Sequence, residues 1–523
     1  MKKYLSRESL AILVAALCLG ASLALLQPGN FLVGWLSFGG LLALAFWLFS
    51  SLWHWAGEGR ALAWMVTLAF VVRLATGLGL YLALPVDGYD DADDRAGFSF
   101  TDAHRRNDQA WELARSEAPI LSAFNKTYHT DQYGGLLAFT SLAYRYLSPD
   151  AQRPVLLIVL SAVMAALGLP FAWRGARLAF GEPVALFAGW MVALYPEGIL
   201  LGGAAMREPY LITFSAICLW GFVHWQIDHA NRGWLWVGLG LAGMLLVSPA
   251  VALVTLVILG GWTWMAREHR RLSWMAFFAL ILVFLAGLAL LVWALNRQGG
   301  FEGSPLGVIA AWFGRAVQWD IYQLERGSGW VQKLFREMPG WLHLPFVAVY
   351  GMLQPVLPAA FIEPTTLTWH ISGITRALGW YLLWPLLLYA PVAAWKTSGV
   401  MEKRLWLWLA GISWAWILLA ALRGGGDQWD NPRYRAIMLL WQALVAGYAW
   451  AWFRKVHDAW LSRVYLVEGV LLVFFTQWYL SRYLLIGGQI PFGWMVALIV
   501  GISLAILVGG GLCDRYRSRK SKA

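Results

Sequence analysis

The sequence is poor in charged residues and in cysteine. Of its 523 residues only 13% are charged, whereas a soluble domain has about 25%. The three cysteines, Cys18, Cys218 and Cys513, each lie within or at the edge of an apolar run. This distribution argues against a disulfide framework and against a zinc site built on cysteine.

Several short motifs of well-known chemistry are also absent. The sequence contains no Walker phosphate-binding loop, no HExxH helix and no GxSxG nucleophile turn. These absences argue against an ATP-driven pump and against a membrane zinc protease.

The sequence is instead rich in apolar residues, which make up 60% of it and fall into blocks. A block of about twenty such residues is long enough to cross a bilayer. The first block has no clear small-residue cleavage site and a second block follows at once, so we interpret it as a retained helix. The fold class predicted is an all-α, polytopic transmembrane bundle of about fourteen spans. The spans begin near Leu10, Phe31, Ala61, Pro154, Pro183, Pro209, Gly233, Pro249, Ser273, Ala377, Leu405, Ile437, Tyr465 and Phe492.

Basic residues gather at both ends of the chain and in short links between the apolar blocks. Because cytoplasmic loops carry an excess of Lys and Arg, both termini are predicted to be cytoplasmic. We expect a multi-pass protein of the cell inner or plasma membrane. The net charge of +11 then reflects membrane orientation, and no nucleic-acid partner is predicted. The scheme requires that Trp341–Phe361, an apolar segment interrupted by three prolines, is re-entrant or interfacial.

This topology divides the chain into three parts. Residues 1–60 form two extra N-terminal transmembrane helices, and residues 454–523 form C-terminal transmembrane helices and a basic tail. The core between them, residues 61–453, carries two large outer loops, 85–153 and 296–376. No soluble domain is predicted, so chemistry must take place where the outer loops meet the helix ends.

The first outer loop contains a carboxylate suited to general-base catalysis. In the stretch TDAHRRNDQAWELARS, Thr101 and Asp102 can cap a helix, and Arg105 and Arg106 follow one turn later. An ionised carboxylate near cations that bind an anionic substrate fits a general base. An ordinary helix-capping aspartate is the alternative.

The acidic run DGYDDADD, residues 87–94, offers rival carboxylates and could bind calcium through oxygen ligands. It lacks the spacing of an EF-hand, so we interpret it as a solvated acidic loop. We predict no cofactor, with a divalent cation as the alternative.

Two later segments place charged side chains at the outer membrane edge. In AAMREPYLITF, Pro209 suits a first helical turn and puts Glu208 at a helix N-terminus, directly after Arg207. In DNPRYRAIML, Arg433 and Arg435 flank Tyr434, and arginine forks suit phosphate oxygens. Ordinary capping and snorkelling cations are the alternatives.

One arginine, Arg73, lies in the middle of a predicted span. A buried cation in a membrane is costly unless it is paired or solvated, so Arg73 is either functional or part of a structural ion pair.

These segments, taken in order, resemble the GT-C superfamily of membrane glycosyltransferases. The branch they are most similar to is the bacterial one of protein O-mannosyltransferases and lipid A aminoarabinose transferases. The resemblance covers roughly Ala61 to Phe453 and is carried by the ordered set rather than by one motif. Two features depart from the pattern: Ala103 follows Asp102 where a paired acidic dipeptide is expected, and two extra spans precede the core.

The resemblance implies a reaction and roles for the candidate residues. It implies transfer of a hexosyl or pentosyl group from a polyprenyl-phosphate donor to a lipid, glycan or protein acceptor at the outer membrane face. Asp102 corresponds to the catalytic base. The substrate-binding residues expected are Arg105, Arg106, Arg207, Glu208, Arg433, Tyr434 and Arg435.

Two other functions fit parts of the sequence. A lipid-linked oligosaccharide polymerase or ligase would rely on arginines of the second outer loop, such as Arg315 or Arg326. A lipid or sugar transporter would need charged or broken helices near the bilayer midplane and an inverted repeat. Convergence of polar residues at the helix ends, rather than at mid-membrane, would favour the transferase.

Overall fold

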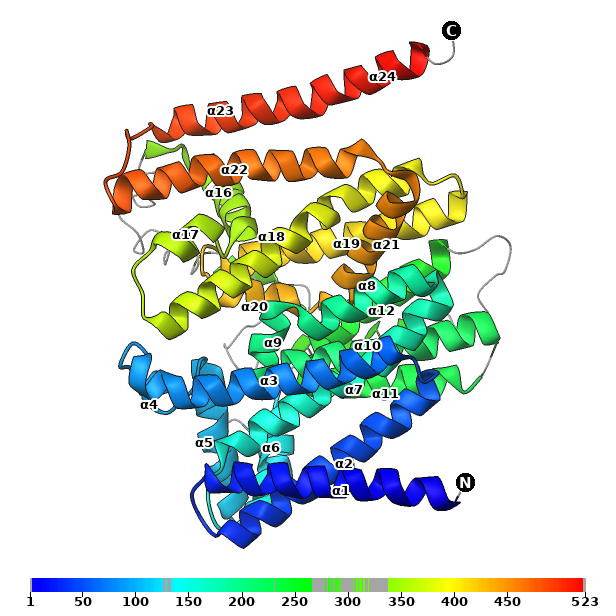
Figure 1. The fold of residues 1–523 in the computed structure, drawn as a ribbon, viewed down its shortest axis with the longest axis vertical. Helices are drawn as coiled ribbons and strands as arrows, with labels where there is room; N and C mark the ends of the chain where they lie inside the picture. Colours follow the sequence, from blue (N-terminus) through cyan, green and yellow to red (C-terminus); the bar gives the residue numbers. More distant parts are fainter. Residues whose placement is uncertain are drawn as a thin grey trace. The chain divides into compact units, whose positions relative to one another are not determined.

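The computed structural model describes residues 2–125, 128, 133–229, 231–265 and 337–520, with scattered positions between 278 and 318. All regular secondary structure in these residues is helical (Figure 1). The predicted all-α fold is therefore confirmed for the described part of the chain.

The chain divides into two compact units. Unit 1 consists of Met1–Trp264, His269–Trp319 and Arg433–Leu444, and unit 2 of Met265–Glu268, Asp320–Pro432 and Val445–Ala523. The helices before Met265 are α1 (Lys2–Leu25), α2 (Phe31–Ala56), α3 (Arg60–Asp87), α4 (Ala92–Arg95), α5 (Thr101–Arg115), the 3₁₀ helix η1 (Ile120–Phe124), α6 (Gly135–Leu147), α7 (Pro154–Phe180), α8 (Glu182–Leu194), α9 (Pro196–Gly203), α10 (Glu208–Asp228), α11 (Gly233–Val247) and α12 (Pro249–Met265).

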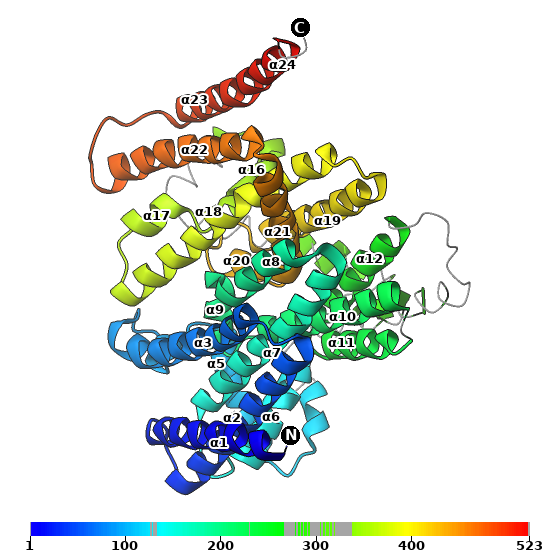
Figure 2. The ribbon, with the colours of Figure 1, turned by 45° about the vertical axis from the view of Figure 1, so that its right-hand side comes forward.

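The helices after residue 337 belong chiefly to unit 2. They are α16 (Gly340–Leu353), α17 (Leu357–Ile362), α18 (Leu367–Lys396), α19 (Val400–Gly424), α20 (Asp430–Ala436), α21 (Leu439–Val456), α22 (Ala459–Tyr483), α23 (Phe492–Leu504), the π-helical turn η2 (Ala505–Gly509) and α24 (Gly510–Lys520). Within unit 2, α18 and α19 run side by side in both ribbon views (Figure 2). Helices α20 and α21 each contain residues of both units.

Nine of the described helices are long and apolar enough to cross a membrane. Two bent pairs, α8 with α9 at 45° and α20 with α21 at 73°, raise the number to as many as eleven. The estimate from sequence is higher because it also counts α11, whose 15 residues are fewer than a span usually needs, and α12, whose described part has 17 residues. The span expected near Ser273 lies outside the described residues.

The segment predicted not to cross the membrane forms two short helices. Trp341–Phe361 falls within α16 and α17, which have 14 and 6 residues. A helix of 14 residues rises only about 21 Å, less than the hydrocarbon core of about 30 Å. Neither helix is long enough to span on its own.

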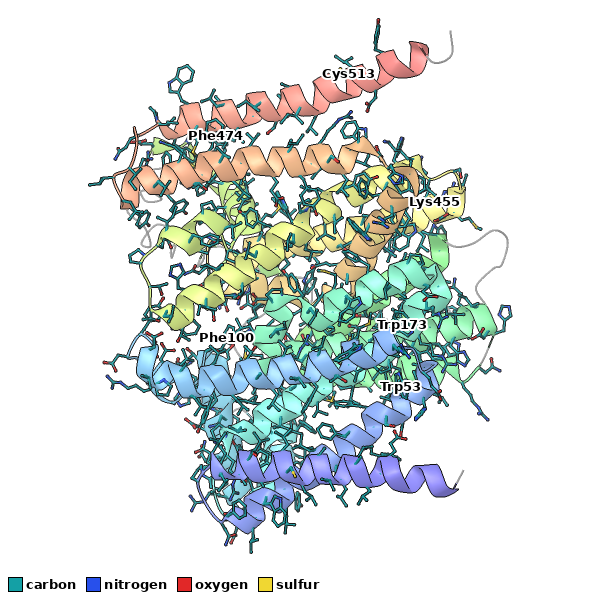
Figure 3. All side chains as sticks on the ribbon, in the orientation of Figure 1. Trp53, Phe100, Trp173, Lys455, Phe474 and Cys513 are labelled. Carbon is teal, nitrogen blue, oxygen red and sulfur yellow. The ribbon has the colours of Figure 1, made fainter. Side chains whose placement is uncertain are left out.

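Helix α7 forms the centre of unit 1, where it packs against α2, α3, α8 and α10. Its glycines allow this: a Cβ added at Gly168 would lie 2.6 Å from the Thr213 hydroxyl oxygen of α10. Trp173 of the same helix is buried among these neighbours (Figure 3).

A second close approach joins α3 to α9. A Cβ on Gly77 would lie 2.5 Å from the carbonyl oxygen of Gly203, so the two backbones touch directly. Gly203 is the last residue of α9. The contact therefore fixes the point at which the chain enters the short connection to α10.

Candidate functional site

The site of unit 1 is built from three chain segments. The first is the start of α5, which follows Phe100, a residue labelled in Figure 3. The prediction that Thr101 and Asp102 cap this helix is wrong, because Phe100 is the N-cap residue and no side chain caps the helix. Asp102 lies instead in the first turn, and the Thr101 hydroxyl donates a hydrogen bond to Asp93 Oδ2 at 2.5 Å.

The second segment is the connection between α9 and α10. Ala205 adopts a left-handed conformation with φ of 54°, which turns the chain sharply. Arg207 then forms the N-cap position of α10, and Glu208 is the first helical residue, ahead of Pro209. The predicted place of Glu208 at a helix N-terminus is confirmed, and its side chain is fully buried.

The third segment is α20, which carries Arg433. The Arg433 Nε lies 2.9 Å from Glu208 Oε1, and its Nη2 lies 2.8 Å from Asp102 Oδ2. One guanidinium therefore bridges carboxylates that are 106 positions apart in the sequence, a separation read from the numbers of the two residues. Fork-shaped pairing of this kind requires arginine rather than lysine.

Two more arginines lie around this bridge. The Arg207 Nε lies 3.7 Å from Glu208 Oε1, and buried Arg106 donates from Nη1 to the Ala205 carbonyl oxygen at 3.3 Å. Three guanidinium groups thus surround the carboxylates of Asp102 and Glu208. The balance of charge is positive, as an anion-binding site requires.

Aromatic rings cover the arginines. The Arg433 guanidinium carbon lies 5.9 Å from the ring centre of Phe100 and 5.7 Å from that of Tyr434, and the carbon of Arg207 lies 6.0 Å from that of Tyr133. Cations at such distances from ring faces are held by the ring quadrupole. Phe100 and Tyr133 were not predicted from the sequence, because nothing in the local pattern links them to distant arginines.

The surroundings of the Asp102 carboxyl favour its ionised form. Partial burial is the largest single effect and raises the pKa of Asp102. The charge of Arg433, the hydrogen bond from that residue and the charges of Arg106 and Arg207 lower the pKa, and together they outweigh burial. The net pKa of Asp102 is below the ordinary value, because the neighbouring cations favour the carboxylate.

The rival carboxylates of the acidic run are engaged elsewhere. Asp91 caps α4 by accepting from the backbone N–H groups of Asp93 and Asp94, Asp90 pairs with Arg95 at 2.6 Å, and Asp93 pairs with His104 at 2.7 Å. The run is therefore a small folded element of its own. Among the described residues, no three His, Cys, Asp or Glu side chains are arranged to hold a metal ion.

The remaining predicted residues lie in different surroundings. Arg435 is buried in α20, and Tyr434 contacts Arg433 beside it. Arg105 is exposed on α5. Of the candidate residues, the structure thus brings together Asp102, Arg106, Arg207, Glu208, Arg433 and Tyr434.

Arg73 donates hydrogen bonds to backbone carbonyl groups. Its Nη1 donates to the Ala193 carbonyl oxygen at 2.7 Å and its Nη2 to that of Val192 at 2.8 Å, at the C-terminal end of α8. A cation there satisfies carbonyl groups that the helix leaves open. Arg73 thereby holds the bend between α8 and α9, and it also fills the space beside Gly202.

No protein-family model matches this sequence, and no curated protein matches it. Solved structures of an oligosaccharyltransferase from Archaeoglobus fulgidus are similar to it. The apo form has a TM-score of 0.41 and 15% identity, and the match covers 85% of this chain and 55% of that one. The complex with an inhibitory peptide and a dolichol-phosphate has a TM-score of 0.38 and 14% identity, with 85% and 54% covered. This chain spans about half the length of that protein.

Proposed function

We propose that this chain is a GT-C type membrane glycosyltransferase that moves a sugar from a polyprenyl-phosphate donor to an acceptor at the outer face. The observation that supports this most directly is the bridge from Asp102 through Arg433 to Glu208, with Arg106 and Arg207 beside it. It combines an ionised carboxylate with several guanidinium groups at the starts of two helices.

Each group has a role in the proposed reaction. Arg433 and Arg207 hold the phosphate of the donor, with Arg106 adding positive charge. Asp102 accepts the proton of an acceptor hydroxyl as the oxygen forms a bond to the anomeric carbon of the sugar. The bond from that carbon to the phosphate oxygen breaks, and its electron pair leaves with the lipid phosphate. The arginines stabilise the charge that develops there.

The position of the site within its helices favours a transferase over a transporter. Asp102 and Glu208 lie in the first turns of α5 and α10, and Arg433 lies in the short helix before a break. A transport site is expected near the bilayer midplane. A polymerase or ligase would rely on arginines of the second outer loop. Of the two candidates named for that function, Arg315 is exposed and Arg326 lies outside the described residues.

The proposal includes an orientation. Both termini are cytoplasmic, the loop 85–153 is outside, and the protein lies in a cell inner or plasma membrane. A single cysteine introduced into the loop should react with a membrane-impermeant reagent added from outside, and one in the link 397–399 should not. The opposite result would reverse the orientation.

The direct test is transfer by the purified protein. The full chain, reconstituted in vesicles, is incubated with polyprenyl phosphate carrying a labelled hexose or pentose and with a membrane extract as acceptor. We expect labelled sugar to leave the lipid and free polyprenyl phosphate to accumulate. In Asp102→Asn we expect neither loss of label nor accumulation of polyprenyl phosphate. If the donor binds but its sugar is transferred to no fraction of the extract, the protein is not a transferase. Movement of intact donor across the vesicle membrane would instead establish a transporter.

A further inference from the structure

Arg433 holds two carboxylates that differ greatly in exposure. Glu208, which pairs with Nε, has a side chain that is 0% exposed, whereas that of Asp102, which pairs with Nη2, is 43% exposed. The Arg433 side chain itself is 6% exposed. One partner is therefore sealed inside unit 1 and the other is open to solvent.

The two pairs differ in how easily they separate. Breaking a buried pair leaves an uncompensated charge out of reach of water, which strongly disfavours it. A half-exposed carboxylate is rehydrated when its partner leaves, so such a pair contributes little. Arg433 therefore keeps Glu208 and is free to exchange Asp102 for another anion.

We propose that the phosphate of the sugar donor takes the place of Asp102 on Arg433, so that binding of the donor releases the base for the acceptor. This inference rests on the proposed function. It adds an order to the reaction, in which donor binding precedes activation of the acceptor.

The surroundings of Asp102 give the exchange its chemical effect. The charged groups that face it are Arg433 of α20, Arg106 of its own helix and Arg207 at the start of α10. When Arg433 turns to the phosphate, Asp102 loses its hydrogen bond and gains a negative neighbour. Both changes favour the protonated carboxyl, so the carboxylate becomes a stronger base.

The proton taken from the acceptor is returned to solvent at the end of the cycle. Asp102 takes the acceptor proton while the sugar is transferred, and the lipid phosphate then departs. Arg433 then returns to Asp102, which favours the carboxylate, and the proton passes to solvent. The base is thus weak while the site is empty and stronger while the donor is bound.

The first test is competition for Arg433. Binding of polyprenyl phosphate without sugar is measured on the full chain and on Asp102→Asn. Because the neutral side chain no longer competes, we expect binding about two- to fivefold tighter in the variant. The matched control is Asp108→Asn on the same helix; Asp108 contacts Gln152 and His104 rather than an arginine. Unchanged or weaker binding in Asp102→Asn would overturn the exchange.

The second test follows the Asp102 carboxyl itself. A water-soluble carbodiimide modifies protonated carboxyls, and the modified peptides are quantified against pH with and without polyprenyl phosphate. We expect the midpoint for Asp102 to move to higher pH when the lipid is bound, while Asp150, paired with Arg153, stays unchanged.

The outcomes of the second test separate the two proposals. If the lipid binds and the Asp102 midpoint stays or falls, the exchange is wrong and the transferase survives. If polyprenyl phosphate does not bind at all, the proposed function fails, and the exchange fails with it.

Discussion

Arg433 and Glu208 form an ion pair that is closed off from solvent: Nε lies 2.9 Å from Oε1, and the side chains are 6% and 0% exposed. The residues are separated by 225 positions in the chain. The pair therefore fastens α20 to the start of α10, and it sets the position from which Arg433 reaches Asp102.

The first prediction is that this pair contributes strongly to stability. Glu208→Gln removes the buried partner of Arg433 and leaves its guanidinium with Asp102 alone. Breaking a buried ion pair costs about 3–5 kcal/mol. We expect a clear fall in the thermal unfolding temperature in detergent. The control is Glu182→Gln, because Glu182 and Arg177 form an exposed pair at 3.6 Å. Equal losses in both variants would show that the Glu208 pair is not special.

The second prediction concerns recognition of the donor. Arg433→Lys keeps a charge for Glu208 but cannot form two parallel hydrogen bonds, so affinity for polyprenyl phosphate should fall about tenfold. From the sequence we expect Arg435→Ala to weaken binding as well. Arg95→Lys is the control, since Arg95 pairs with Asp90 at the surface. Undiminished affinity in both site variants would remove these arginines from the phosphate site.

Helix positions were largely predictable because a run of apolar residues has few other ways to satisfy its backbone in lipid. The expected starts at Phe31, Pro154 and Phe492 coincide with the observed ones. Length was harder to predict: α11 is apolar but has only 15 residues, fewer than a span usually needs.

The site was predictable in its residue types but not in its pairings. Local pattern marked Asp102 at the head of a predicted helix, Glu208 at a helix N-terminus and Arg433 at the start of a span. That Arg433 joins the other two depends on how distant helices pack, which no local periodicity contains. Arg73 shows the same limit: its burial was expected, but its backbone partners at the end of α8 were not.

The third prediction concerns pH. The hydrogen bond from Arg153 lowers the pKa of Asp150, burial opposes this, and a bond from the Asn30 N–H lowers it further, to about 2. Because the folded pKa is below the ordinary 3.8, the stabilisation is present above that value and lost as pH falls towards 2.

Asp150→Asn measures this effect. At pH 7 we expect a loss of about 1 kcal/mol after allowance for solvent screening. Unfolding temperatures of the two proteins should converge as the pH falls from the ordinary pKa of 3.8 towards 2. Asp228→Asn serves as control, since Asp228 is half-exposed beside His224. A difference that stays constant down to the lowest pH would contradict the ion pair as its cause.

The last prediction separates catalysis from structure in the first outer loop. Asp102→Asn removes basicity and keeps shape, so turnover should fall about 10²–10⁴-fold. Stability should change little, because Phe100 rather than Asp102 is the N-cap residue of α5. Asp91→Asn should do the reverse: it weakens the cap of α4 by about 0.5–2 kcal/mol and leaves turnover near normal.

Turnover and unfolding temperature, measured on the same two preparations, decide between these roles. If Asp102→Asn is active and Asp91→Asn is inactive but folded, the base lies in the acidic run 87–94. If both variants are active, no carboxylate tested acts as the base. The transferase mechanism would then be abandoned for a polymerase that relies on arginines or for a transporter. A cluster of arginines without a base can bind a lipid phosphate but cannot activate an acceptor.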